Sequence, residues 1–343
     1  MIEYKYTVSK YQEAQRKHQE DLIQNSELFR GDKAGAIYKK TPRPFVLLDG
    51  RNNLFDKIRQ SVIDYFNSNK ISWWGGRVSG HVLSSQIACL NHLFPLRNNP
   101  EILKNILNNA TNMNFEEVLP IPEWLDKQEN GSKHYVSFEV VSYKDNLNEA
   151  TEGKELTRGS NCTSIDAFII AKDQKKEVWI IPIEWKYTEF YQNMDKSQED
   201  RRGETKGENG KGEERMKRYC NLITQSVQLK TLNVYQGSIY FQEPFYQLMR
   251  QTLWAEQVLA KEADKWYGAK HYMHIHIVPS ANSDLLYKNY KRFLSMTNGM
   301  ETEWREHLSN KDLYKIIDPK EFVQPIKSEY PDLYSYLQTR YWQ

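Results

Sequence analysis

The sequence predicts an α/β fold, in which a central mixed sheet is flanked by helices. Two neighbouring apolar runs, 163–170 and 178–185, are rich in β-branched and aromatic residues, as paired strands are. A third segment, 135–141, alternates apolar and polar residues, which is typical of a half-buried strand. Segments before and after these strands repeat their apolar residues at helical spacing, so we expect helices on both sides of the sheet.

Besides a helix beginning near Glu213, five helices are predicted in chain order, over 8–29, 53–66, 84–94, 98–107 and 244–260. Ser84 or Ser85 is placed to cap the third helix, and Pro95 marks its end. Pro244 suits the first position of the fifth helix, because a proline there loses no helical hydrogen bond. We expect three regions: a helical region over 1–110, the core over 111–285, and a helical extension over 286–343.

The two apolar runs carry charged residues where they would meet. The charged connection 172–176 has the composition of a hairpin turn, so the two runs should pair. Side chains alternate along a strand, so Glu184 and Lys186 project together, and Asp166 can share their face. Two carboxylates and an ammonium group would then converge on one spot.

This triplet suits the hydrolysis of phosphodiesters. Two carboxylates hold Mg²⁺, which prefers oxygen ligands, and Mn²⁺ could substitute for it. The metal would polarise the phosphate and lower the pKa of a bound water. Lys186 would orient that water or neutralise developing charge. The triplet therefore indicates a metal-dependent nuclease.

A plainer interpretation is also open. Glu-x-Lys occurs at 3–5 and 152–154 as well, so the tripeptide alone decides nothing. Charges at a strand end are usually solvated, and an Asp opposite a Lys is often only a cross-strand pair. The third copy differs because it ends the most apolar strand and a second strand supplies Asp166.

At these residues the chain resembles the PD-(D/E)XK nuclease superfamily, the restriction-endonuclease-like fold. Asp166, Glu184 and Lys186 would be its signature residues, and Ile165 stands where the pattern has Pro. Segments 84–94, 182–187 and 243–251 are similar to bacterial restriction endonucleases within it. The resemblance implies a Mg²⁺-dependent endodeoxyribonuclease of restriction type, with DNA as its substrate.

The resemblance also implies supporting residues. Glu139, on the strand before Asp166, would be an additional metal ligand, and Gln86 would face the DNA or the ligands. Gln247 and Arg250 share one face of the predicted helix 244–260 with Gln251. A buried Arg is expensive unless it is paired, so Arg250 either points to solvent or faces the acidic site or a phosphate.

Two further features concern the strands. Pro182 lacks a donor for the sheet, so we expect an edge position or a bulge there. Segment 272–278 should close the sheet, with His274 and His276 on its polar face. No third ligand accompanies this pair, so we favour a structural role over a metal site.

The segment 192–215 is charged and nearly free of apolar residues, so we expect a flexible, solvated loop there. A flap that orders over DNA is the alternative, with Arg201, Arg202, Lys206 and Lys211 meeting phosphates. Exposed tryptophans could also stack on unpaired bases, although most should pack in the core. The candidates are Trp73, Trp74, Trp254 and Trp266.

Composition limits the class of protein. The net charge of +2 argues against binding nucleic acid by overall basicity, so a local patch must do it. The three cysteines have no paired spacing, which fits a reducing cytoplasm. No apolar run is long enough to cross a bilayer and the first residues lack a signal core, so we set membrane and secreted classes aside.

The biological task stays open at this point. The same catalytic triplet serves repair, recombination or mobile-element enzymes, and a DNA-binding or assembly protein could keep an inactive nuclease core. A double-strand break needs two cutting centres, so we expect a homodimer on DNA.

Overall fold

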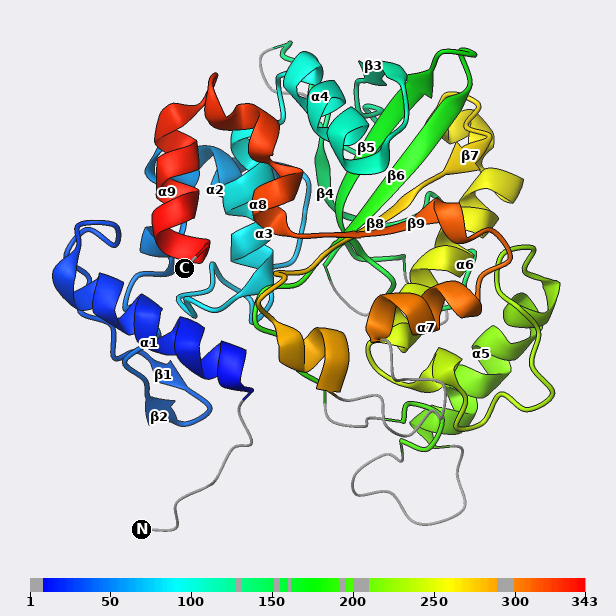
Figure 1. The fold of residues 1–343 in the computed structure, drawn as a ribbon, viewed down its shortest axis with the longest axis horizontal. Helices are drawn as coiled ribbons and strands as arrows, with labels where there is room; N and C mark the ends of the chain where they lie inside the picture. The colour runs from blue at the N-terminus through cyan, green and yellow to red at the C-terminus, as the bar shows by residue number, and fades with distance from the viewer. Residues whose placement is uncertain are drawn as a thin grey trace.

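The computed structural model describes residues 9–127, 131–150, 155–159, 162–191, 195–199, 210–288 and 299–342. A seven-stranded mixed sheet crosses the molecule with helices on both faces (Figure 1), which confirms the predicted α/β class. The strand order is β3-β5-β6-β8-β9, with β4 also paired to β5 and β7 to β6. The strands are β3 (Phe115–Leu119), β4 (Ser137–Val140), β5 (Ile165–Asp173), β6 (Val178–Trp185), β7 (His271–Tyr272), β8 (His274–Ile277) and β9 (Tyr314–Ile317).

The predicted hairpin forms from β5 and β6. They pair antiparallel with Ala167 opposite Ile183, so Asp166 lies across from Glu184 on the same face. In the turn, the Asp173 carboxylate accepts hydrogen bonds from the backbone N–H groups of Lys175 (2.9 Å) and Glu177 (3.0 Å). This turn marks one end of the hairpin, and the charged residues lie at the other.

Two expectations about the sheet are wrong. The strand at 274–277 does not close it, because β9, from a segment expected to be helical, pairs with β8 on its outer side. Pro182 is neither at an edge nor in a bulge: it pairs in register with Phe168, inside the sheet. On its other side, β6 pairs in parallel with β7 up to Ile180 and with β8 from Ile183. Pro182 lies between these two pairings, so no backbone N–H is required from it.

Helices cover the two faces of the sheet around separate apolar cores (Figure 1). One face is covered by α2 (Arg59–Ser68), α3 (Ser85–Leu93), α4 (Pro100–Thr111), α8 (Pro319–Phe322) and α9 (Pro331–Tyr341), and α1 (Lys10–Asn25) packs beside α9. The other carries α5 (Lys211–Gln225), α6 (Phe245–Lys261) and α7 (Met300–Glu306). Strands β1 (Ile37–Tyr38) and β2 (Thr41–Pro42) form a separate small hairpin.

Shorter turns connect these elements. They are the 3₁₀ helices Gly50–Asn53, Asp56–Ile58, Phe94–Leu96, Ile239–Phe241, Ala263–Trp266, Lys311–Leu313 and Gln324–Lys327, and a π-helical turn at Asp284–Lys288.

Helix ends follow the local signals in most cases. Ser84 caps α3 by accepting a hydrogen bond from the Ile87 N–H, as predicted. The helix expected over 53–66 is broken, since 3₁₀ turns come first and α2 begins only at Arg59. Part of the charged segment 192–215, including Arg201, Arg202 and Lys206, lies outside the described residues, whereas Lys211 begins α5.

His274 and His276 lie in the core and not on an exposed polar face, which corrects the prediction. They are 2% and 0% exposed. His276 Nδ1 lies 2.9 Å from the Tyr314 hydroxyl, whereas neither ring nitrogen of His274 has a hydrogen-bond partner among the described residues. Burial lowers the pKa of His274 to about 4, against a small opposing effect of Glu184.

Replacing His274 by Phe should therefore make the fold less sensitive to acid. The pKa of His274 is 6.5 when unfolded and about 4 when folded, so the unfolded chain binds the proton more tightly. Stability from the neutral ring is present above pH 6.5 and is lost as the pH falls toward 4, by about 3 kcal/mol. Urea unfolding of both proteins at pH 7.5, 5.5 and 4.5 measures the difference. Equal losses in the two proteins would contradict it.

Candidate active site

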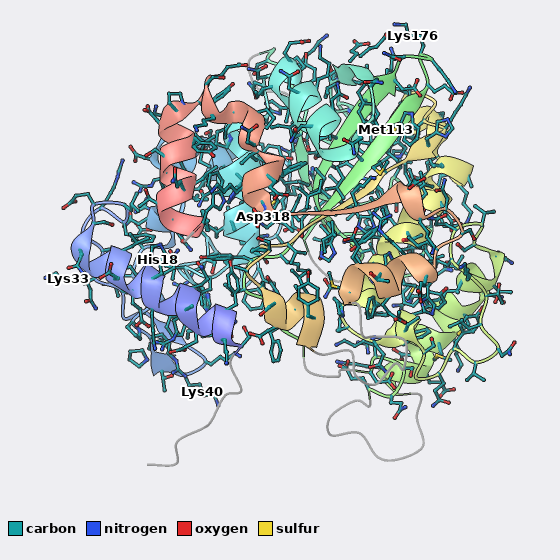
Figure 2. The ribbon with its side chains drawn as sticks, in the orientation of Figure 1. His18, Lys33, Lys40, Met113, Lys176 and Asp318 are labelled. Carbon is teal, nitrogen blue, oxygen red and sulfur yellow. The ribbon has the colours of Figure 1, made fainter. Side chains whose placement is uncertain are left out.

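A cavity of about 630 Å³ opens where the start of β5 meets the ends of β4 and β6. It lies at the end of the β5–β6 hairpin opposite Lys176, the turn residue labelled in Figure 2. The structure brings all the sequence-predicted site residues to this cavity: Gln86, Glu139, Asp166, Glu184, Lys186, Gln247 and Arg250. Helix α3 supplies the first, α6 the last two, and the strand ends the rest.

Glu184 is held by two donors. Its Oε1 accepts a hydrogen bond of 2.5 Å from Lys186 Nζ, and its Oε2 accepts one from Gln251 Nε2. Glu184 and Lys186 are 4% and 6% exposed, so this is a buried ion pair. Gln251 was recognised on the same face as Gln247 but was not predicted as a site residue. Its position one helical turn further along α6 is the signal that could have found it.

Lys186 bridges the strand and the helix. Its Nζ also donates to Gln247 Oε1 at 2.5 Å, and its backbone N–H donates to Ile277 O at 2.8 Å. Burial by itself lowers the pKa of Lys186, but Glu184 and further acidic neighbours outweigh burial, so the pKa is well above its usual value. The ammonium group therefore keeps its charge inside the cavity.

Gln247 belongs to a wider network that sequence reasoning missed. Its Nε2 donates to the Tyr191 hydroxyl and to Glu243 Oε2, both at 3.0 Å. Because Gln247 accepts from Lys186 and donates to these two groups, its amide orientation is set from both ends. No local sequence signal marks Tyr191 or Glu243 as members of the site.

Asp166 is the most strongly perturbed acid of the site. Its Oδ2 accepts a hydrogen bond of 2.7 Å from the backbone N–H of Trp185. Burial, followed by repulsion from Glu184 and Glu139, raises the pKa of Asp166 well above its ordinary value. A cation bound beside Asp166 would offset the factors that disfavour its charge.

Glu139 reaches the site with an unusual backbone. Its φ of 50° is in the left-handed region, which non-glycine residues adopt rarely and at a cost. Gln86 Nε2 donates to Glu139 Oε1 at 2.6 Å. Burial raises the pKa of Glu139, against the opposing hydrogen bonds from Gln86 and Ser164.

Arg158 holds this strained strand in place. Its guanidinium donates to the carbonyl oxygens of Phe138 (2.6 Å) and Glu139 (3.3 Å) and pairs with Asp126 at 2.9 Å. The side chain is 8% exposed, so the ion pair is largely shielded from water. Sequence reasoning did not single out Arg158 or Asp126, and no local pattern indicates them.

Arg250 lines the cavity as one half of an ion pair. Its Nε and Nη2 lie 3.1 and 3.0 Å from Glu149 Oε1. Glu149 is 9% exposed and also accepts hydrogen bonds from Thr163 and Tyr219. The acidic partner of Arg250 is therefore Glu149, which lies outside the predicted triplet.

The oxygen atoms of the site suit a hard divalent cation. An ionised carboxylate has about four lone-pair sites, so Glu184 keeps acceptor capacity beside its two donors. Gln251 Oε1 and Gln86 Oε1 are buried and accept no hydrogen bond from any described residue. Across the described ranges, no group of three or more His, Cys, Asp or Glu side chains forms a ready metal cage. Carboxylates, amide oxygens and water would together complete the ligands that Mg²⁺ prefers.

Comparison with known families agrees with this chemistry. Residues 9–342 match the family described as "Restriction Endonuclease associating with ARP". The chain belongs to this family. The match spans nearly the whole chain, so it supports a restriction-endonuclease-like protein and a nuclease, for which DNA is the implied substrate.

The other comparisons are negative. No curated protein and no solved structure matches the chain. Among the described residues, no helix is both long enough and apolar enough to span a membrane.

Proposed function

We propose that this chain is a Mg²⁺-dependent endodeoxyribonuclease of restriction type, and a member of the PD-(D/E)XK superfamily. The observation that carries the proposal is the convergence of Asp166, Glu184 and Lys186 in one cavity at a strand end. Membership of a restriction endonuclease family supports it independently. Repulsion among the buried carboxyls gives the site a reason to bind a cation.

Each side chain has a distinct task in this proposal. Asp166 and Glu184 would hold Mg²⁺, with Glu139 as a supporting ligand. When bound, the metal would neutralise charge on the phosphate and lower the pKa of a water molecule. Lys186 keeps its proton and donates hydrogen bonds toward the attacking water or the phosphate oxygens.

The amides from the helices position these groups. Gln247 and Gln251 hold Lys186 and Glu184, respectively, against α6, and Gln86 holds Glu139. Arg250 reaches the cavity already paired with Glu149, so its contribution to phosphate binding is that of a partly neutralised cation. These residues are positioning groups in the proposed reaction.

Incubation with supercoiled plasmid DNA tests the proposal. Cleavage is expected with Mg²⁺ or Mn²⁺ and should stop when a chelator is added. Ca²⁺ should support DNA binding with little cutting, if the metal must activate water and not only bridge charges. Cleavage that continues unchanged without divalent metal would refute the metal-dependent mechanism.

The same reaction reports on assembly. We propose a homodimer on DNA, because one cutting centre per chain nicks one strand. Light scattering with cognate DNA should then show two chains per complex, and linear plasmid should accumulate. A monomer that yields only nicked circles would favour a repair or mobile-element nickase instead.

A further inference from the structure

The structure separates one tryptophan from the others that sequence reasoning considered together. Trp254 and Trp266 are 1% and 0% exposed. Trp73 stacks on Phe66, with ring centroids 3.8 Å apart and planes inclined by 14°. Trp74, by contrast, is 65% exposed and lines the cavity that holds Asp166 and Glu184. What sets Trp74 apart is its position, because an exposed indole that lines the candidate active site can contact a ligand bound there.

Tyr38 and His81 are among the rings that line the cavity with Trp74. Tyr38, at the end of β1, makes an edge contact with His81 at 4.8 Å, and Phe45 contacts His81 at 5.3 Å. Burial, and then the charge of Lys39, lowers the pKa of His81 to about 4. The imidazole is therefore neutral near pH 7. Trp74, Tyr38 and His81 form what we call the aromatic wall, which carries no charge.

Backbone geometry fixes where Trp74 is presented. Gly75 and Gly76 follow it with φ of 85° and 78°, a conformation that favours glycine. A Cβ at either glycine would meet no atom within 4 Å, so open space surrounds this turn. The turn therefore holds Trp74 at the mouth of the cavity without packing against it.

The rest of the cavity is strongly acidic. Five carboxyl groups line it, against two cationic side chains that are both paired with Glu. The carboxyl groups are Glu139, Asp166, Glu184, Glu189 and Glu243. Phosphates are repelled by such a surface except where a cation neutralises it. An uncharged aromatic wall beside it suits the uncharged face of a nucleobase, which stacks on tryptophan regardless of sequence.

We propose that the aromatic wall binds an unpaired or extruded nucleobase, so that DNA containing an unstacked base is the preferred substrate class. In paired duplex DNA the base faces are covered by their neighbours, and Trp74 could reach none of them. Basic residues at the tip of the β1–β2 hairpin flank the wall: Lys39 Nζ lies 5.5 Å from the centre of the Tyr38 ring, and Lys40 is exposed there (Figure 2). They are placed to meet the phosphates on either side of the stacked base. This inference rests on the proposed nuclease function for the identity of the polymer.

The test compares DNA binding in Ca²⁺, with a fully paired duplex and the same duplex carrying one bulged 2-aminopurine. Wild-type protein should prefer the bulged duplex and quench its fluorescence by stacking. Trp74→Ala should lose about 5- to 150-fold in affinity for the bulged duplex only. Trp74→Phe should recover part of the loss. The matched control is Tyr267→Asn, which removes a 46%-exposed ring outside the cavity at a position with φ of 57° that Asn tolerates.

Several outcomes would overturn the inference. One is equal affinity of wild type and Trp74→Ala for the bulged duplex. Another is an equal loss of affinity of Trp74→Ala for both duplexes, which would indicate a contact that does not depend on an unstacked base. The inference and the nuclease assignment fail in different ways. If wild-type protein cleaves plasmid in Mg²⁺ and Trp74→Ala binds the bulged duplex as tightly as wild type, the inference alone is refuted. If wild-type protein prefers the bulged duplex but cleaves no DNA in Mg²⁺, the nuclease assignment is refuted, whereas the nucleobase site is supported.

Discussion

Asp166→Asn is expected to abolish DNA cleavage and to raise the melting temperature of the metal-free protein. The amide keeps an oxygen to accept the Trp185 N–H but removes one negative charge from beside Glu184 and Glu139. Turnover should fall by roughly 10² or more, because a charge that acts on the reacting phosphate is lost. Each kcal/mol of relieved repulsion should raise the melting temperature by roughly 1–2 °C in a chain of this length. A functional carboxylate is thus distinguished from a structural one, whose loss destabilises the fold.

The gain in stability should depend on pH in a defined direction. The pKa of Asp166 is raised in the folded protein above 3.8, its value when unfolded. Its contribution to stability is complete below pH 3.8 and is lost as the pH rises through the folded pKa. The advantage of Asp166→Asn should therefore grow as the pH rises above 3.8. Added Mg²⁺ should raise the melting temperature of the wild type and not that of the variant.

Asp173→Asn is the matched control, because Asp173 ends the same strand at the hairpin turn, outside the cavity. It should cleave plasmid at the wild-type rate and lose a little stability, since its carboxylate caps the turn. Scanning calorimetry and plasmid cleavage measure both variants. An Asp166→Asn protein that cuts normally would remove Asp166 from the site.

The site residues that can be predicted from the sequence are those whose side-chain direction is set by the regular period of a strand or helix. The hairpin signal at 172–176 sets β5 against β6, and pairing then places Asp166 opposite Glu184. Helical spacing likewise places Gln247 and Gln251 on one face of α6, toward the strands. In each case the period of one element limits where a side chain can point.

The elements that could not be predicted from the sequence are those that depend on contacts between distant parts of the chain. Strand β3 has two exposed residues, Glu116 and Glu117, inside its five, so its alternation is broken. Strand β9 is only four residues long, and its partner β8 lies far away in the sequence. A glutamate has no local preference for the left-handed φ of Glu139, whose carbonyl oxygen accepts a hydrogen bond from the distant Arg158.

Lys186→Met should lower turnover by about 10²–10⁴ while DNA still binds in Ca²⁺. Methionine fills most of the volume of the lysine but cannot donate to Glu184 or Gln247. The variant should also lose stability, by about 3–5 kcal/mol, because it leaves a buried carboxylate without its cation. Plasmid cleavage, DNA binding and urea unfolding give the three measurements.

A double variant tests how far Lys186 and Glu184 stabilise one another. Adding Glu184→Gln to Lys186→Met removes the carboxylate that lost its partner, so most of the stability should return, whereas cleavage should stay absent. Because Glu184 is itself a proposed metal ligand, the double variant reports on stability and not on catalysis. The coupling energy between the two positions follows from the four unfolding free energies. Full turnover in the single variant would show that the charge of Lys186 does not act on the reaction. No recovery of stability in the double variant would show that it does not stabilise Glu184.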